Sequence, residues 1–318
     1  MKSFILNILA LVSLATLLVV EPAMARDTQQ SGFNEVYCTP QVPAKTTFAG
    51  KEIDLTRYDM YERYERELTT ACYMHSTTML TLKRANRYLP VIVPILKQQS
   101  IPLDFIYLAA IESAFNPLAY SPAKAAGIWQ FMASTAREYG LEVNEDIDER
   151  YNVEKATVAA CKYLRNAYKK YGSWVNAAAA YNAGTKRITA ELERQDVDEA
   201  FDLHLVQETS RYVFRILATK EVFSSPQKYG FHLTEKQLYQ PIETHTVEVD
   251  TTITNLATWA QEQGITYREL KEFNPWLRSR KLPNKSGKKY KILIPVKADM
   301  YYTDKRRYKT YDRNWIVE

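Results

Sequence analysis

The sequence contains few glycines, cysteines and histidines: 9, 3 and 4 of them, respectively, among 318 residues. The glycines form no glycine-rich loop, so there is no motif for binding a nucleotide phosphate. The histidines are scattered, and no spacing of histidine and cysteine resembles a metal site. They are His75, His204, His232 and His245. We therefore expect the protein to use neither a metal ion nor a cofactor.

The three cysteines, Cys38, Cys72 and Cys161, allow at most one disulfide in an oxidising compartment and leave one thiol over. Cys72 and Cys161 both fall in helical patterns, where buried thiols fit equally well. The sequence alone does not choose a pair.

The formal net charge is +5 and the sequence pI is near 8.8. This mild basicity would suit an anionic wall polymer, but it is not specific to one. We find no indication of a nucleic-acid partner.

The N-terminus has the order of a secretory signal peptide. Lys2 is followed by an apolar run from Phe4 to Val20, and then by Ala23-Met24-Ala25, a cleavage signal of small residues. The alternative is a membrane anchor, since about 17 apolar residues is the short end of a spanning helix. The cleavage signal favours removal of residues 1–25. We expect an exported protein of the periplasm or cell envelope with no stable membrane span.

The segment before the main helical region, residues 26–52, is polar and irregular and is predicted to be a linker or arm. Apolar residues then recur at three- and four-residue steps, which predicts an N-terminal helical region over 53–94 that packs on the next domain. Pro90 and Pro94 are expected to break or kink the helical pattern.

Residues 95–232 are predicted to form a second helical region. Pro102 is expected to open a helix that ends near Glu112-Ser113, followed by a loop over 118–126. Further helices are predicted to end at Tyr139 and to cover 154–171, 174–182 and 208–223. The alanine-rich helix over 174–182 is expected to be central.

The C-terminal part changes character. Strands are predicted over 244–249 and 291–295, with short helices over 255–263 and 267–273 between them. This βααβ order describes a small α/β module over 243–296. The basic tail over 297–318 receives no predicted structure. The expected fold class is therefore mainly α, with a small C-terminal α/β module.

Glu112 is the first candidate for chemistry. It ends an apolar helix, and a partly desolvated carboxyl has a raised pKa. A glutamate held protonated near neutral pH can donate a proton to a glycosidic oxygen. The alternative is an exposed or structural residue at a helix end.

Several motifs in order resemble the lytic transglycosylase family, of the membrane-bound murein transglycosylase D type. They are Glu112-Ser113-Ala114-Phe115-Asn116-Pro117, Ala119-Tyr120-Ser121-Pro122, Ala126-Gly127-Ile128-Trp129-Gln130-Phe131-Met132, Ala180-Tyr181-Asn182-Ala183-Gly184 and Glu208-Thr209 with Tyr212-Val213. The resemblance covers about residues 55–231. It implies a lysozyme-like catalytic domain that acts on peptidoglycan glycan strands.

The resemblance also assigns roles to single residues. Glu112 matches the catalytic general acid and base. Ser113 matches a residue that helps hold the site, and Ser121 and Gln130 match residues that line the sugar cleft. Tyr181 and Asn182 match a pair that faces the glutamate and contacts the substrate N-acetyl group. Glu208 matches a supporting acid behind the cleft. Ala123 stands where some relatives have a polar residue.

The family's reaction needs one carboxyl, because the C6 hydroxyl of N-acetylmuramic acid (MurNAc) attacks its own C1 and leaves a 1,6-anhydro end. An ordinary glycosidase needs two carboxyls. Asp104 lies about 12 Å from Glu112 by the helical rise, too far for an inverting pair. A hydrolytic muramidase is the alternative, because a second carboxyl could come from Asp146, Asp148 or Glu149. The simpler interpretation of these three residues is a solvated acidic loop. The third hypothesis is a non-catalytic protein that binds peptidoglycan.

The C-terminal module resembles a divergent LysM domain. The matching segments are His245-Thr246-Val247, Leu256-Ala257, Asn274-Pro275 and Ile292 to Pro295. Val249-Asp250-Thr251 replaces the usual Gly-Asp-Thr turn. The resemblance implies a LysM fold and binding to chains of N-acetylglucosamine (GlcNAc), with a packing domain that has no ligand as the alternative.

Overall fold

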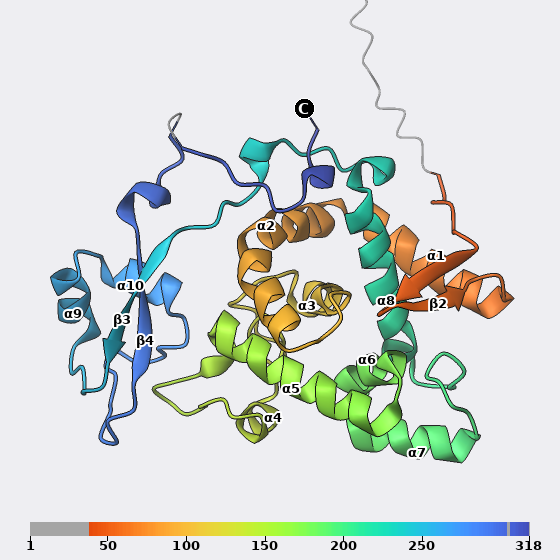
Figure 1. Cartoon of the computed structure of the whole chain (residues 1–318), viewed down its shortest axis with the longest axis horizontal. Helices are drawn as coiled ribbons and strands as arrows, with labels where there is room; N and C mark the ends of the chain where they lie inside the picture. The colour runs from red at the N-terminus through yellow and green to blue at the C-terminus, as the bar shows by residue number, and fades with distance from the viewer. Residues whose placement is uncertain (1–37, 304–305, 318) are drawn as a thin grey trace, which may run out of the picture. The chain divides into compact units, whose positions relative to one another are not determined.

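The computed structural model describes residues 38–303 and 306–317, so the predicted signal peptide lies outside the described part. The described residues are mainly helical, with two small antiparallel sheets (Figure 1). No helix among them is long and apolar enough to cross a membrane. The predicted fold class, mainly α with a C-terminal βααβ module, is confirmed.

Most predicted elements are present with small shifts at their ends. The observed elements, from the N-terminus, are β1 (Lys45–Phe48), β2 (Lys51–Asp54), α1 (Tyr58–Tyr73), α2 (His75–Gln98), α3 (Phe105–Ser113), α4 (Ala133–Glu138), α5 (Val153–Tyr171), α6 (Trp174–Ala183), α7 (Thr185–Gln195) and α8 (Gln207–Ser224). The C-terminal module contains β3 (Thr244–Val249), α9 (Leu256–Glu262), α10 (Tyr267–Phe273) and β4 (Tyr290–Pro295).

The predicted irregular arm over 26–52 is wrong from Lys45 onward, where β1 and β2 form a hairpin. Its turn places Ala49 and Gly50 at φ of 51° and 82°, a left-handed pair that matches the strand twist. A contact distant in sequence holds the alanine there, because its N–H donates to Asp104 Oδ2 at 2.9 Å. The local sequence does not contain that information.

Two further differences concern the helices α2 and α7. Pro90 and Pro94 lie inside α2, which continues to Gln98, so of the expected break or kink the break is wrong. Buried residues along α2, including Leu89 and Ile92, pack into the core and stabilise the helix despite the lost hydrogen bonds. The unpredicted α7 buries only Ile188 completely, which leaves a weak periodic pattern.

The main core surrounds α3, which packs against α2 and α8, while α5 packs on α2 and α6 (Figure 1). The predicted central position of α6 is confirmed by Ala177 to Ala180, which are at most 1% exposed. Small side chains on this helix let its neighbours approach closely. Helix α3 is thereby fixed at the centre, with Glu112 in its last turn.

The C-terminal tail has structure, although the sequence predicted none for it. Trp315 is 2% exposed, and its Nε1–H donates to the Phe223 carbonyl at 2.9 Å. The Tyr311 N–H donates to the Asn86 side chain at 2.7 Å. The tail therefore ties the end of the chain to α2 and α8.

We predict that Trp315→Ala lowers the free energy of unfolding by about 3 to 5 kcal/mol, because it empties a buried site and removes a hydrogen bond. Chemical denaturation followed by circular dichroism measures the change. Tyr301→Ala is the control, since Tyr301 is 57% exposed and its loss should cost under about 0.5 kcal/mol. Equal stability of the two variants would contradict a structural role for the tail.

Candidate active site

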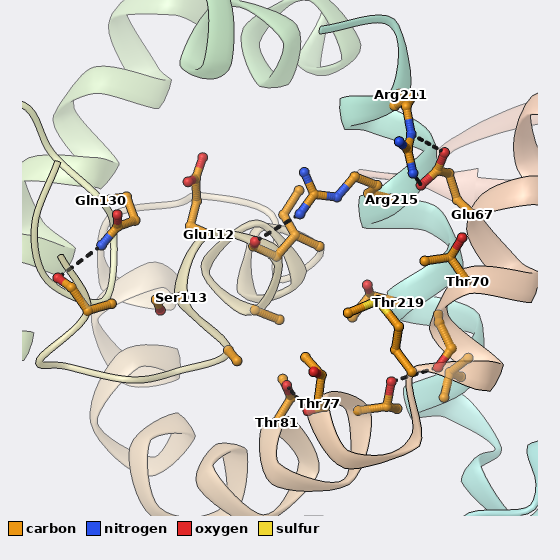
Figure 2. A pocket seen from close by; sticks show the side chains of 18 of the residues that line it. Glu67, Thr70, Thr77, Thr81, Glu112, Ser113, Gln130, Arg211, Arg215 and Thr219 are labelled. Atoms are coloured by element: carbon orange, nitrogen blue, oxygen red, sulfur yellow. Dashed lines mark hydrogen bonds and ion pairs between the residues drawn. The ribbon is translucent and has the colours of Figure 1, made fainter. Parts of the chain in front are cut away.

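A cleft of about 560 Å³ lies beside the end of α3, with side chains from distant parts of the chain around it (Figure 2). Part of its wall comes from α1 and α2, part from the loop after α3, and part from α8. Polar lining residues are Glu67, Thr70, Thr77, Thr78, Thr81, Glu112, Ser113, Ser121, Gln130, Glu208, Arg211, Arg215 and Thr219. The predicted N-terminal helical region thus helps to build the cleft.

Glu112 projects into this cleft from the last turn of α3 (Figure 2). The helix ends sharply because Ala114 and Phe115 have left-handed backbones, at φ of 51° and 52°. Such conformations cost about 1 to 3 kcal/mol for residues other than glycine, so the surrounding fold must enforce them. Phe115 is fully buried, so the packing of its side chain in the core holds the backbone in this conformation.

Burial raises the pKa of Glu112 to about 7, and the negative charge of Glu208 adds to the rise. The hydrogen bond from Tyr212 and the positive charge of Arg215 oppose it. The desolvation is the larger effect. Glu112 is therefore protonated up to about neutral pH, as a general acid requires.

Tyr212, which is buried, and Tyr181, which is partly buried, lie near this carboxyl. The Tyr212 hydroxyl donates to Glu112 Oε1 at 2.5 Å, and the Tyr181 hydroxyl donates to the Trp129 carbonyl at 2.8 Å. Burial raises the pKa of both phenols well above the usual value, and the negative charge of Glu112 raises it further. Both tyrosines consequently remain protonated donors.

The loop after α3 brings Gln130 and Ser121 to the cleft. Gln130 Nε2 donates to the carbonyls of Ala119 at 3.2 Å and Gly127 at 2.7 Å, so the side chain fastens its own loop. Ser121 Oγ accepts from the Ala125 N–H at 3.0 Å. Both residues line the cleft while also stabilising the loop.

Ser113 faces the same loop from the end of α3. Its hydroxyl donates to the Ile128 carbonyl at 2.8 Å and so joins the end of α3 to the loop. Tyr181 and Asn182, at the end of α6, are not among the side chains that line the cleft in the described part of the chain. Tyr181 lies close enough to Glu112 for the charge of that carboxylate to raise the pKa of its phenol.

Sequence reasoning missed the arginines of α8. Arg211 makes two hydrogen bonds to Glu67, at 2.7 and 3.1 Å, and so ties α8 to α1 (Figure 2). Arg215 pairs with Glu208 at 3.2 Å and also donates to the Ile111 carbonyl at 3.2 Å. Their spacing at four residues on the predicted helix placed both on one face, but no local pattern indicated which face meets the cleft.

Asp146, Asp148 and Glu149 do not line the cleft. The expectation of a solvated acidic loop is wrong for Asp148 and Glu149, which are 6% and 2% exposed. Asp148 pairs with Arg150, and Glu149 pairs with Lys155. These cations offset the free-energy cost of burying the two carboxylates. Neither carboxylate is therefore free for catalysis in the cleft.

Among the described residues, no group of three or more histidine, cysteine, aspartate or glutamate side chains could hold a metal ion.

We predict that Gly127→Ala disrupts the loop that carries Gln130. A Cβ at this glycine would lie 1.8 Å from the Arg150 carbonyl oxygen, and the φ of 79° disfavours any side chain. Gly172→Ala is the matched control, since its φ is 63° but nothing lies within 4 Å. Thermal unfolding should show Gly127→Ala at least about 2 kcal/mol less stable than the control. Equal losses of stability in the two variants would mean that the contact with the Arg150 carbonyl is relieved at no cost in free energy.

We also predict that Glu112→Gln gains stability over the wild type as pH rises from 4.5 to about 7. In this window the unfolded glutamate loses its proton while the folded one keeps it, so rising pH favours wild-type unfolding. The neutral glutamine escapes this loss, and the gain should be about 1 to 3 kcal/mol above pH 7. Denaturant unfolding at several pH values measures it. Glu62→Gln, at an exposed position on α1, is the control, and its stability relative to the wild type should not change with pH in this way. If the difference in unfolding free energy between Glu112→Gln and the wild type does not change with pH, the raised pKa is refuted.

Comparison with known proteins gives a consistent picture. Residues 92–202 match the family model of the transglycosylase SLT domain, and residues 245–298 match the soluble lytic transglycosylase C-terminal LysM-like domain. The chain is 31% identical over 250 residues to membrane-bound lytic murein transglycosylase D of Escherichia coli K12. That alignment covers 74% of this chain and 51% of the relative, so the chain spans about half the relative's length.

Two further similarities are more distant. Membrane-bound lytic murein transglycosylase C of Glaesserella parasuis serovar 5 is 26% identical over 186 residues, covering 51% of this chain and 50% of that protein. The crystal structure of the 70 kDa soluble lytic transglycosylase of Escherichia coli aligns with a TM-score of 0.37 and 24% identity, over 42% of this chain and 23% of that one. The chain is therefore a homologue of the lytic murein transglycosylases, with a transglycosylase SLT domain at residues 92–202 and a LysM-like domain at residues 245–298.

Proposed function

We propose that this protein is a peptidoglycan lytic transglycosylase that cleaves the MurNAc-(β1,4)-GlcNAc bond and forms 1,6-anhydroMurNAc, with Glu112 as its only acid and base. One observation carries the proposal: a single carboxyl with a pKa near 7 lies in the cleft of a chain that has an SLT domain. The relatives described above are named membrane-bound lytic murein transglycosylases D and C, which supports the same reaction class.

In the first step, Glu112 donates its proton to the glycosidic oxygen as the bond from that oxygen to MurNAc C1 breaks. The hydrogen bond from Tyr212 occupies Oε1, so Oε2 is the oxygen left to carry the proton. The substrate's N-acetyl oxygen stabilises the positive charge that develops at C1. Tyr212 holds the carboxyl in one orientation throughout.

In the second step, Glu112 is a carboxylate and takes the proton from the MurNAc C6 hydroxyl. The C6 oxygen forms a bond to C1 and closes the anhydro ring. The proton balance is complete, since Glu112 ends the cycle protonated as it began. No water molecule is consumed.

The cleft supports the use of one carboxyl rather than two. Within the described chain, Glu67 and Glu208 are the other carboxylates that line it. Glu67 is 2% exposed and paired with Arg66 and Arg211. Glu208 is paired with Arg215, which supports its assignment as a supporting residue.

We further propose that Ser121, Gln130, Tyr181 and Asn182 bind the glycan, and that Ser113 positions the loop beside Glu112. Ser121 and Gln130 line the cleft with groups that can contact a sugar. The two α6 residues rest on the match of the Tyr181-Asn182 motif to the family.

The proposed domain division follows the sequence, except that the predicted arm over 26–52 contains the β1–β2 hairpin from Lys45 onward. The other parts are a signal peptide over 1–25, an N-terminal helical region over 53–94, a catalytic domain over 95–232, a LysM-like domain over 243–296 and a tail over 297–318. Export to the periplasm or cell envelope and binding of glycan strands by the LysM-like domain belong to the same proposal.

A hydrolytic muramidase is the alternative, and Glu208 favours it, because this second carboxylate lines the same cleft and its side chain is 67% exposed. Hydrolysis would leave a reducing end, whereas the proposed reaction gives fragments lighter by one water molecule. A protein that only binds peptidoglycan would release no fragments.

Digestion of purified peptidoglycan, followed by mass spectrometry of the soluble fragments, tests the proposal. We predict anhydro products from the wild type, and at least about a thousandfold loss of rate in Glu112→Gln, which has no proton to donate. Glu62→Gln, at an exposed position on α1, is the control and should cleave normally.

Other outcomes have distinct meanings. Reducing-end products that disappear in Glu208→Gln would establish the hydrolase instead. Undiminished cleavage by Glu112→Gln would show that another residue is the acid.

A further inference from the structure

The C-terminal module shares a hydrophobic core with residues near the cleft loop. Ala126, Ile147 and Tyr151 lie in one buried cluster with side chains of the module such as Leu277 and Tyr290. Ala126 is fully buried and belongs to the same loop as Gln130. The module is thus packed on the catalytic part of the chain rather than tethered to it by a linker alone.

Backbone hydrogen bonds join the same two parts. The Asp148 N–H donates to the Trp276 carbonyl at 2.9 Å, and the Arg278 N–H donates to the Asp146 carbonyl at 2.7 Å. Ile147 and Leu277 form an antiparallel bridge between these bonds. The segment over 146–148 is therefore held in register by the module.

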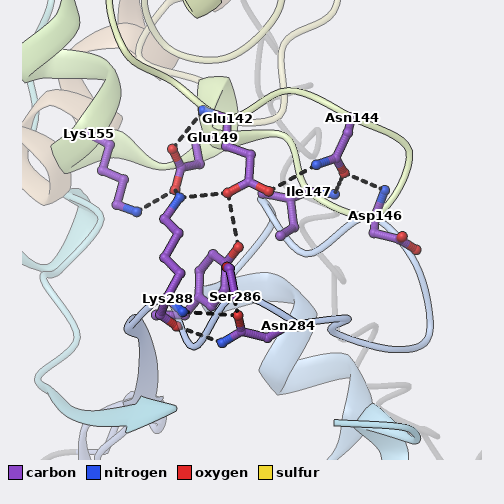
Figure 3. Close-up of polar contacts among 10 residues, drawn as sticks. Glu142, Asn144, Asp146, Ile147, Glu149, Lys155, Asn284, Ser286 and Lys288 are labelled. Atoms are coloured by element: carbon purple, nitrogen blue, oxygen red, sulfur yellow. Dashed lines mark hydrogen bonds and ion pairs between the residues drawn. The ribbon is translucent and has the colours of Figure 1, made fainter. Parts of the chain in front are cut away.

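A set of charged groups surrounds this junction (Figure 3). Lys288 Nζ lies 2.6 Å from Glu142 Oε2, and the Tyr290 hydroxyl donates to the same oxygen at 3.0 Å. Lys288 Nζ is also 3.6 Å from the buried Glu149 carboxylate, which pairs with Lys155. A buried carboxylate needs such partners, so the module contributes one of the cations on which this segment depends.

The next residues connect the junction to the cleft. The Arg150 guanidinium makes two hydrogen bonds to Asp148, at 2.9 and 2.7 Å. Its remaining terminal nitrogen donates to the carbonyls of Lys124 at 2.9 Å and Phe131 at 3.0 Å. Both carbonyls belong to the loop that brings Ser121 and Gln130 to the cleft.

This arrangement is rigid because its charges are buried. Asp148 and Arg150 are each 6% exposed. Moving either one would leave a charge without its partner in the protein interior, a change that costs several kcal/mol. The planar guanidinium also fixes the directions of its hydrogen bonds, which a lysine cannot reproduce.

We infer that Asp148 and Arg150 are positioning residues, which set the cleft loop over 119–131 and are themselves held by the C-terminal module. The module then affects turnover in the cleft, in addition to any contact it makes with the wall. The inference rests on the proposed function of the cleft for its kinetic part only, because the position of the loop can be measured without substrate.

The first test compares Arg150→Lys with Arg137→Lys in the full-length protein. Arg137 is exposed, and its guanidinium also donates two hydrogen bonds to a backbone carbonyl, that of Val143, which lies outside the cleft loop. We expect Arg150→Lys to lower kcat at least about tenfold on purified peptidoglycan, while binding to insoluble peptidoglycan stays unchanged. Arg137→Lys should match the wild type.

The second test measures hydrogen–deuterium exchange in the loop over 119–131. Lys288→Ala should raise the exchange rate of these amides at least about threefold, and Lys288→Arg should restore the slow exchange. Lys291→Ala, on the exposed side of β4, is the control and should leave the loop unchanged.

Unchanged loop exchange in both Arg150→Lys and Lys288→Ala would overturn the inference. An equal rise in exchange over the whole chain would do the same, because it would indicate general loss of stability. If the wild type releases no fragments, the proposed function fails, yet the exchange result still decides whether the module and Arg150 position the loop.

Discussion

Desolvation of the Glu112 carboxyl is the constraint on which the rest of the site depends. Helix α3 is apolar along most of its length and lies in the centre of the core, so its last turn carries the carboxyl away from bulk water. The hydrogen bond from Tyr212 and the charge of Arg215 would favour ionisation, but they do not outweigh burial. The two opposing effects place the pKa near 7, where one group can serve as acid and then as base.

The cleft around this carboxyl extends beyond the matched SLT domain at residues 92–202. Tyr212 lies on α8, and Glu67 lies on α1, where Arg211 ties the two helices together. The N-terminal helices and α8 are therefore parts of the site's wall rather than additions to a finished domain. This explains why the polar lining includes threonines from α1, α2 and α8.

The part of the chain that follows α8 returns twice to the helical part. The tail places Trp315 against α8, and the LysM-like module packs on the segment before α5. Through Asp148 and Arg150, the second of these contacts reaches the loop that carries Gln130. The module contact, though distant in sequence, is therefore connected to the loop beside α3, whereas the tail contacts α8.

Sequence alone determined the features that depend on local pattern. Most of the helices, the βααβ order of the module and the ordered motifs around Glu112 follow from periodicity and short-range spacing, which do not depend on distant neighbours. Tertiary structure decided what distant partners control: the bond from Tyr212 to Glu112, the burial of Asp148 and the continuation of α2 through Pro90. Desolvation and ion pairing depend on which residues meet in space, and the local pattern does not contain that information.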